Sequence, residues 1–276
     1  MDNLTQQSSE LRSPRRLGEI LDQSFPIAFK VVKVIFPILL LAALLTLLDS
    51  EETFAKFEGK VDNKHLSGLQ LVIYILRKIA GGLTGLSIYL LTVPMAAEAW
   101  NGREVKLNNI KKYFSFILLL RMLALWIRVS IIGGLGLLLF VIPGAIYILN
   151  RCLAFFPLFL EGLSVKDSLL KSKTLMLHGP STLFMSETQW RATGLFMVAM
   201  ILSFLPMIIF GAAYTGSSTL GKAFTLGIYF LFTLAYFAAS IYSNVAILGL
   251  YFDLRSRTEG NDLLEAIDKL RQTATP

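Results

Sequence analysis

The sequence predicts an all-α, polytopic membrane protein with six transmembrane helices in three hairpins, each preceded by a cytoplasmic-side interfacial amphipathic helix. Its 276 residues are 54% hydrophobic and only 16% charged, whereas soluble domains are about 25% charged. Its apolar runs also approach or exceed the ~20 residues that a helix needs to cross a bilayer. Turn signals and basic segments divide these runs into pairs. The composition therefore excludes an ordinary soluble domain.

The first third of the chain contains a tail, an interfacial helix and the first hairpin. Residues 1–13 are polar and non-periodic, and we expect a mobile cytoplasmic tail there. From residue 14, apolar residues at helical spacing predict an interfacial helix. Residues 27–48 form the first predicted span, and the uncharged residues 79–97 form the second. Because no cleavage pattern follows a short apolar core, the first span is expected to remain as an anchor.

The middle of the chain is predicted to form the central hairpin. Residues 101–112 are basic and have one apolar face, which favours a second interfacial helix. The spans of the hairpin are expected at residues 120–142 and 145–163, with the break at Pro143 and Gly144. A break this short forces the two helices to lie antiparallel.

The last hairpin follows a third interfacial helix. Ser164 is the expected N-cap of that helix, with Asp167 three residues later. The fifth and sixth spans are predicted at residues 192–213 and 223–251. Residues 253–276 are polar, and we expect a cytoplasmic C-terminal tail with a short amphipathic helix.

The basic residues predict the orientation of the single transmembrane domain, residues 14–252. Of the 26 Lys and Arg residues, 15 lie in segments on the side that holds the termini and 4 lie on the other side. The other 7 lie in or at the ends of spans. This imbalance places both termini in the cytoplasm. Anionic lipids of the cytoplasmic leaflet are then the expected partners of the interfacial helices, and nucleic-acid binding is not indicated.

Three charged residues of the central hairpin are the main candidates for a polar intramembrane site. An Arg at the centre of a membrane helix costs about 2.5 to 3.5 kcal/mol. Counted from the turn, Arg128 and Glu161 lie at similar depth, so we expect them to approach each other, with Arg121 as a competing partner. Arg151 lies on the same hairpin. A structural ion pair is the preferred interpretation, and a site for an anionic lipid or substrate headgroup is the alternative.

Two amides complete this candidate site, and no catalytic set accompanies it. Asn150 and Asn244 lie inside predicted spans, where an amide is expected to hydrogen-bond between helices. Cys152 is the single cysteine, and His65 and His178 are isolated from each other. No nucleophile and base can be paired, so we expect no enzyme, no cofactor and no metal site.

Three stretches resemble one known family. Residues 143–172 begin Pro-Gly-Ala-Ile-Tyr-Ile-Leu-Asn-Arg and continue through Leu-Glu-Gly-Leu-Ser. They resemble the middle of the glycerophosphodiester phosphodiesterase membrane-domain family, which includes YciC-type bacterial proteins. Residues 250–260 are similar to the C-terminal signature of that family, and residues 17–25 are similar to its opening. The resemblance covers most of the chain.

This resemblance implies a multi-pass protein of the bacterial cytoplasmic (inner) membrane. The family is named for members fused to a phosphodiesterase barrel, and 276 residues leave no room for a barrel of about 250 residues. No hydrolase activity is therefore implied. The resemblance points to Arg151 and Glu161, and to Asp253 and Arg255 as a candidate cytoplasmic signature.

The functional expectation is correspondingly general. We expect a non-catalytic integral membrane protein that organises, senses or scaffolds at the bacterial cytoplasmic membrane or envelope, with a possible membrane-protein partner. The alternative is a transporter or lipid-handling protein that uses a polar intramembrane site around Arg128, Arg151 and Glu161. The sequence specifies neither a substrate nor an oligomeric state.

Overall fold

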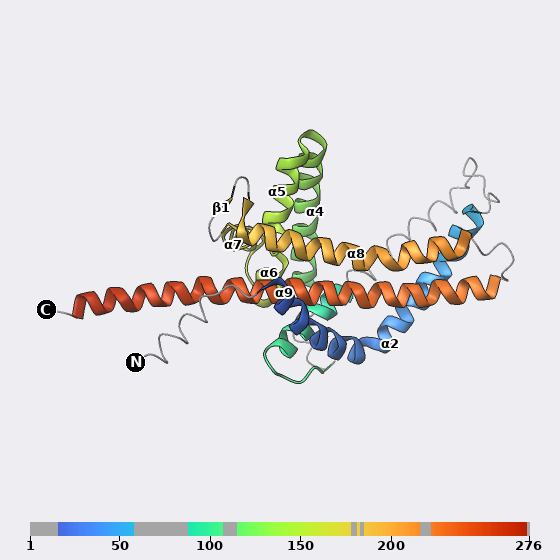
Figure 1. Ribbon diagram of the computed structural model, residues 1–276, viewed down its shortest axis with the longest axis horizontal. Coiled ribbons are helices and arrows are strands. Elements are labelled where there is room, and N and C mark those ends of the chain that lie inside the picture. Colours follow the sequence, from blue (N-terminus) through green and yellow to red (C-terminus); the bar gives the residue numbers. More distant parts are fainter. Residues whose placement is uncertain are drawn as a thin grey trace. The chain divides into compact units, whose positions relative to one another are not determined.

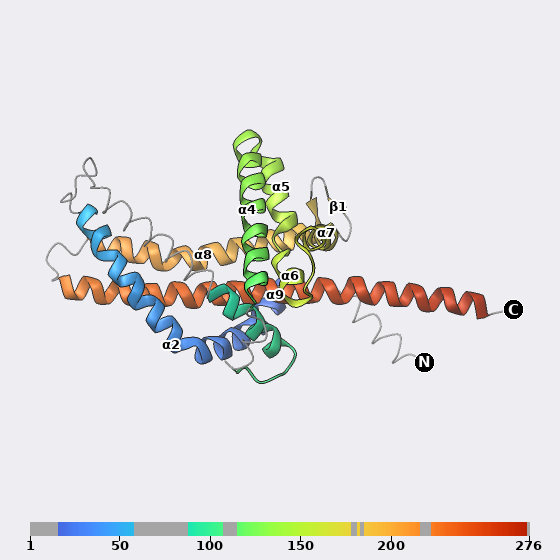
Figure 2. The same ribbon diagram turned by 180° about the vertical axis from the view of Figure 1, so that it is seen from behind.

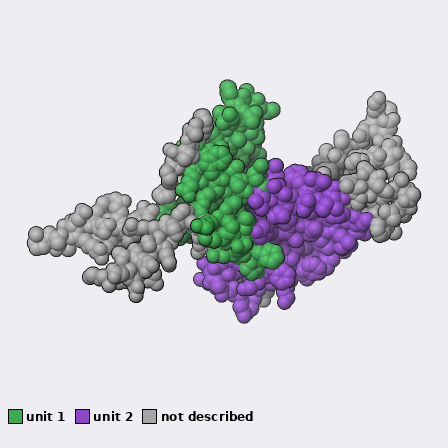
Figure 3. All heavy atoms as spheres, viewed as in Figure 1, with its two compact units in different colours: residues 1–26, 111–197, 245–276 green, residues 27–110, 198–244 purple. Residues whose placement is uncertain are grey.

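The computed structural model describes residues 16–57, 88–106, 115–177, 181–182, 185–215 and 222–274. Nearly all of them are helical (Figure 1). Five helical segments are long and apolar enough to cross a membrane: Leu17–Thr46, Ile117–Leu139, Val141–Leu160, Glu187–Pro206 and Leu226–Gly260. The chain divides into unit 1, residues 1–26, 111–197 and 245–276, and unit 2, residues 27–110 and 198–244 (Figure 3).

The first described element is longer than the sequence predicts. Helix α2, Leu17–Phe57, is one continuous helix where an interfacial helix and a separate span are expected. Pro26 and Pro37 lie within it, and each proline removes one backbone donor without ending the helix. Ile88–Trp100 is a shorter apolar helix and forms the C-terminal part of the predicted second span. The beginning of that span lies outside the described residues.

The central hairpin is present, but its turn is displaced from the predicted break. Helix α4, Phe116–Leu139, and helix α5, Val141–Arg151, are separated only by Phe140. They lie side by side in both views (Figures 1 and 2). Pro143 falls in the first turn of α5, where backbone donors have no helical acceptor to lose. The proline is therefore compatible with the helix and does not mark the turn.

Glycines allow the two arms of this hairpin to approach closely. A Cβ atom built on Gly144 would lie 2.3 Å from the backbone nitrogen of Leu137. One built on Gly136 would lie 3.0 Å from the Cα atom of Gly144, and one on Gly133 2.6 Å from Cγ1 of Ile148. Small residues are the usual means by which apolar helices pack backbone against backbone.

The predicted fourth span is broken in the structure. After α5, the backbone amides of Cys152, Ala154 and Phe156 each bond to the carbonyl three residues earlier, as in a tight turn. Helix α6, Phe155–Leu160, follows, and Pro157 within it has no amide to bond to the carbonyl of Leu153. Phe156, Leu158 and Phe159 are buried inside unit 1.

A capped surface helix and a short β-pair come next. Helix α7, Val165–Met176, begins at the predicted N-cap, where the Ser164 hydroxyl accepts the amide of Asp167 at 3.2 Å. Strands β1, Ser181–Thr182, and β2, Met185–Ser186, pair antiparallel. Leu169, Leu175 and Met176 on α7 are buried, whereas Leu170 is 60% exposed.

Two long helices complete the chain. Helix α8 is Glu187–Thr215 and contains Pro206, and helix α9 is Lys222–Ala274. The 53 residues of α9 form one helix, whereas the sequence predicts a span and a separate short helix. No proline occurs between Phe252 and Ala274, and Gly260 alone does not end the helix. Tyr251, on the part of α9 that belongs to unit 1, is fully buried.

Candidate functional site

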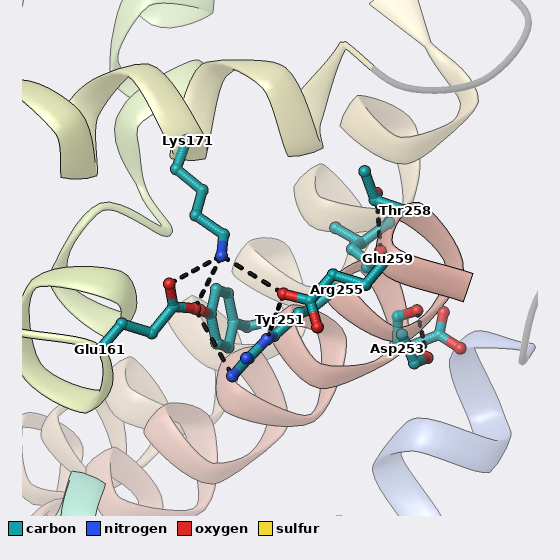
Figure 4. A network of polar contacts seen from close by, with 9 residues as sticks. Glu161, Lys171, Tyr251, Asp253, Arg255, Thr258 and Glu259 are labelled. Carbon is teal, nitrogen blue, oxygen red and sulfur yellow. Dashed lines mark hydrogen bonds and ion pairs between the residues drawn. The ribbon is translucent and has the colours of Figure 1, made fainter. Parts of the chain in front are cut away.

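A network of charged side chains joins three helices of unit 1, and we refer to it as the Glu161 cluster (Figure 4). Its five members are Glu161, Lys171, Tyr251, Arg255 and Glu259. Glu161 is the residue at which α6 ends, and Lys171 lies on α7. The other three lie on α9 at intervals of four residues and therefore share one face of that helix.

The local sequence fixes where the Glu161 side chain begins. Gly162 has a φ of +69°, a conformation that glycine adopts without strain. The amides of Glu161 and Leu163 both bond to the carbonyl of Pro157, which closes α6. The chain then turns into α7 through the Ser164 cap, so that Lys171 returns to Glu161.

Every charge in the Glu161 cluster has a neighbour of the opposite sign. Lys171 Nζ lies 2.9 and 2.7 Å from the two carboxylate oxygens of Glu161, and 3.5 Å from Glu259 Oε1. Arg255 Nε donates to Glu259 Oε1 at 2.7 Å, and its Nη1 lies 3.5 Å from Glu161 Oε1. The Tyr251 hydroxyl donates to the same Glu161 oxygen. The Glu161 carboxylate is thus engaged on both oxygens, at 15% exposure of its side chain.

A second group, the Asp253 cluster, lies on the neighbouring face of α9. Asp253 Oδ2 accepts from Arg257 Nη2 at 2.7 Å and lies 3.6 Å from Arg191 Nη1 on α8. The Asp253 side chain is only 6% exposed. One buried carboxylate therefore joins the start of α8 to α9, and removal of it would leave two guanidinium groups facing each other.

The end of α5 is bound to α7 and to the start of α8. Asn150 Oδ1 accepts from Gln189 Nε2 at 2.6 Å, and its backbone carbonyl accepts from Ser172 Oγ at 2.9 Å. The Arg151 guanidinium donates to the backbone carbonyl of Leu169. It also lies over the ring of Tyr147, 5.7 Å from the ring centroid.

The start of α8 is held by a reciprocal cap. The Gln189 amide donates to Ser186 Oγ at 3.2 Å, and Gln189 Oε1 accepts from the Ser186 amide at 2.7 Å. This is a capping box in Ser-Glu-Thr-Gln, a sequence signal that the prediction of the fifth span at residue 192 did not use. Ser186 Oγ also donates to the carbonyl of Met176 at 2.6 Å.

The structure separates the residues of the predicted intramembrane site. The expected pair of Arg128 and Glu161 is wrong, because Glu161 pairs instead with Lys171 and Arg255. Arg121 and Arg128 are exposed on α4, and neither has an ion pair within the described part of the chain. The depth count assumed one straight helix from the turn to Glu161, and the break after α5 invalidates it.

The remaining predicted residues fall into three places. Asn150 makes the interhelical hydrogen bond expected of an amide inside an apolar run, and Arg151 lies beside it. Asn244 is half-buried in unit 2. Asp253 and Arg255, which the resemblance singles out, lie in the two clusters.

Sequence reasoning missed the partners that complete these clusters. On α9, the charges at positions 253, 255, 257 and 259 alternate in sign along two faces of one helix, which is a recognisable pattern of i,i+4 pairs. Lys171 and Arg191 carried no comparable signal, because their partners are 10 and 62 residues distant in the sequence.

Within the residues that the structure describes, no three His, Cys, Asp or Glu side chains are grouped so that they could hold a metal ion. Away from the apolar helices, Glu104 and Lys106 form an exposed ion pair, and the hydrogen bond from Lys106 lowers the pKa of Glu104. Comparisons with protein-family models, with curated proteins and with solved structures found no match.

Proposed function

We propose that this chain is a non-catalytic, multi-pass protein of the bacterial cytoplasmic membrane that organises, senses or scaffolds there. The observation that carries the proposal is the closed Glu161 cluster. Both carboxylate oxygens of Glu161 are bonded to groups of the chain itself. A general acid or base must instead reach a substrate proton within hydrogen-bond distance. The arrangement therefore suits a structural junction.

The position of this junction along the chain favours the membrane surface. The apolar part of α9 ends at Phe252, and both clusters use the charged residues that follow it. Charged groups of this kind are stable where a helix leaves the hydrocarbon. The excess of Lys and Arg on the side of the termini supports a cytoplasmic location for this surface. A rigid, charged platform at that surface is suited to hold a membrane-protein partner and anionic lipids.

The topology proposed here has both termini in the cytoplasm. The sequence predicts six crossings in three hairpins, and the described helices supply five candidates. Any even number of crossings places both termini on the same side of the membrane. A topology reporter fused after Pro276 is expected to be active in the cytoplasm, and a reporter active only outside it would overturn the orientation.

The alternative function, a transporter or lipid-handling protein, retains one supporting observation. Arg128 is exposed on an apolar helix, and no ion pair to it occurs among the described residues. An anionic headgroup would satisfy it. However, this alternative needs Arg128, Arg151 and Glu161 to lie together in one site, and their contacts do not bring them together.

We also propose membership of the glycerophosphodiester phosphodiesterase membrane-domain family, on the resemblance of residues 143–172 and 250–260. These stretches contain Glu161 and two of its partners, Lys171 and Arg255. A resemblance concentrated on a mutual contact is what a shared structural junction would produce. An alignment of family members in which these three positions vary independently would count against this assignment.

The functional proposal is tested by cross-linking in cells, followed by purification in mild detergent and mass spectrometry of co-purified proteins and lipids. We compare the wild-type chain with Glu161→Gln, and use Glu104→Gln, a change at an exposed ion pair, as the control. The expected result is a stoichiometric protein partner that Glu161→Gln loses and Glu104→Gln retains. A tightly bound solute or single lipid species, with no protein partner, would favour the alternative.

A further inference from the structure

The tip of the central hairpin is the most exposed apolar surface of the described chain. Its five consecutive large apolar residues are 68 to 84% exposed: Leu138, Leu139, Phe140, Val141 and Ile142. The segment from Val129 to Leu149 contains no charged residue. We propose that the α4–α5 hairpin enters the bilayer from one surface and turns back within the hydrocarbon, with acyl chains covering its tip.

Hydrogen bonds fix the depth of the C-terminal end of α5 relative to the membrane surface. Asn150 and Arg151 are bonded to Gln189, Ser172 and the carbonyl of Leu169. These partners lie on α7 and in the first turn of α8. Helix α7 carries three lysines and an aspartate, and α8 begins at a glutamate. Such segments lie at the membrane surface, because each charge would be costly in hydrocarbon. The end of α5 therefore lies at the surface as well.

The length of α5 then limits how deep the tip can reach. Eleven residues of α-helix extend about 16 Å. The hydrocarbon core of a bilayer is about 30 Å thick. Tilting of the hairpin reduces the depth further, so this limit holds for any orientation of the arms. The tip reaches at most about the middle of the bilayer.

The other arm of the hairpin gives the same depth. Arg128 precedes Phe140 by 12 residues, or about 18 Å of helix, so it lies at nearly the level of Arg151. Both guanidinium groups would then lie at the headgroups, with 22 uncharged residues between them. Trp126, which is 57% exposed, lies at the same boundary, where tryptophan is commonly found. The exposure of Arg128 without an ion pair in the described chain is then explained.

A full crossing by this hairpin would be unfavourable. With the tip at the far surface, Arg151 and Asn150 would lie about 14 Å inside the near boundary of the hydrocarbon. Helix α7 would follow them, because it is bonded to both residues. Lys171 and Glu161 would be drawn in as well. Each such charge costs a few kcal/mol in hydrocarbon, so hydropathy is a poor guide for this segment.

The turn itself is suited to lipid, where backbone groups need partners within the protein. The Phe140 amide donates to the Gly136 carbonyl at 2.8 Å, and the Gly144 amide donates to the Phe140 carbonyl at 3.0 Å. Pro143 has no amide. Among the amides of the turn, at most those of Val141 and Ile142 remain to be satisfied, as do the carbonyls of Leu137 to Leu139 at the end of α4.

The consequence is a two-helix wedge in a single leaflet. Such a wedge displaces lipid on one side of the membrane only, which gives the proposed organising role a physical basis. Only the assignment of the wedge to the cytoplasmic leaflet rests on the proposed function. The chain then crosses the bilayer four times in place of six, and its termini remain on the same side.

Cysteine accessibility tests the inference in the full-length protein. In a Cys152→Ala background, single cysteines are introduced by Phe140→Cys at the tip, Trp126→Cys on the arm and Ser217→Cys between α8 and α9. A membrane-impermeant maleimide is applied to intact cells and to inverted membrane vesicles. Denatured samples give full labelling as the reference.

A hairpin that turns back within the bilayer and a hairpin that crosses it predict opposite labelling of the tip and the arm. From either side, we expect Phe140→Cys to react at least about tenfold more slowly than Ser217→Cys reacts in intact cells, because water is absent from hydrocarbon. Trp126→Cys is expected to react from the cytoplasmic side. Rapid labelling of Phe140→Cys in intact cells, with Trp126→Cys protected, would overturn the inference.

Depth measurement provides a second readout on the same variants. A bimane fluorophore attached through Phe140→Cys is expected to be quenched more by nitroxide lipids labelled in mid-chain than by those labelled at the headgroup. Stronger quenching by the headgroup label would also overturn the inference. Labelling of Ser217→Cys from the cytoplasmic side alone would reverse the proposed orientation, while a protected Phe140→Cys would still support the turn-back. Neither readout depends on finding a partner.

Discussion

Gly144→Ala provides the sharpest test of how the central hairpin is held together. The added Cβ would lie 2.3 Å from the Leu137 nitrogen and 2.4 Å from the Gly136 carbonyl carbon. Real Cβ contacts essentially never fall below 3.0 Å. The arms of the hairpin must therefore separate by at least 0.7 Å (3.0 − 2.3), since the obstructing atoms are backbone atoms that no rotamer change can move.

The expected cost follows from this geometry. Overpacking of a close contact typically costs 1 to 3 kcal/mol, and we expect about 3 kcal/mol because both helices must shift. By the scaling of soluble domains, this corresponds to a fall in Tm on the order of 5–10 °C. The assay is thermal unfolding of the purified protein in one mild detergent, followed by the loss of monomer on size-exclusion chromatography after heating.

Gly134→Ala is the matched control, because a Cβ at Gly134 meets nothing within 4 Å. Alanine is the better helix former by up to about 1 kcal/mol, so this variant should be neutral or slightly more stable. Equal Tm values for Gly144→Ala and Gly134→Ala would show that the arms are not in backbone contact. The same result would remove the rigid hairpin on which the depth argument relies.

Three further changes test the junctions of unit 1 in the same thermal assay. Asp253→Asn should lower stability by about 3 kcal/mol, because Arg191 and Arg257 lose their buried partner; unchanged Tm would argue against the pair. Gln189→Ala should cost about 1–3 kcal/mol, because it removes a cap and leaves Asn150 Oδ1 without its donor. Ser164→Ala should cost about 1 kcal/mol through loss of the α7 cap, and Ser164→Asp should restore most of it.

The sequence was informative where one local rule decides the structure. The Ser164 cap and the helix after it were predicted because the capping signal is contained in four residues. The hairpin of α4 and α5 was predicted because a short break in apolar sequence permits little else. The position of the turn at Phe140 was not predicted, because a proline such as Pro143 fits the first turn of a helix as well as the break between two helices.

Reasoning from sequence was weakest for contacts between distant segments. Arg128 and Glu161 were paired by counting residues along an assumed straight helix, and the tight turn at 152–154 made that count invalid. The actual surroundings of Glu161 depend on Lys171 and on α9, and neither could be placed relative to Glu161 from residue spacing. Spacing predicts contacts within one helix, whereas contacts between helices require their packing.

Segment 141–160 shows why hydropathy could not assign this region. It has the length and apolar character of a span, but its two halves use that character differently. In α6, Phe156, Leu158 and Phe159 are at most 5% exposed and pack inside unit 1. At the tip, Val141 and Ile142 are about 70% exposed and need an apolar environment such as lipid acyl chains. The free energy of transferring an apolar side chain out of water is favourable for a protein interior and for lipid alike. A hydropathy window therefore cannot distinguish a buried segment from a lipid-exposed one. The hydrogen bonds of Asn150 and Arg151 do distinguish the two halves, because they hold the boundary between them at the level of α7 and the start of α8, which carry charged residues.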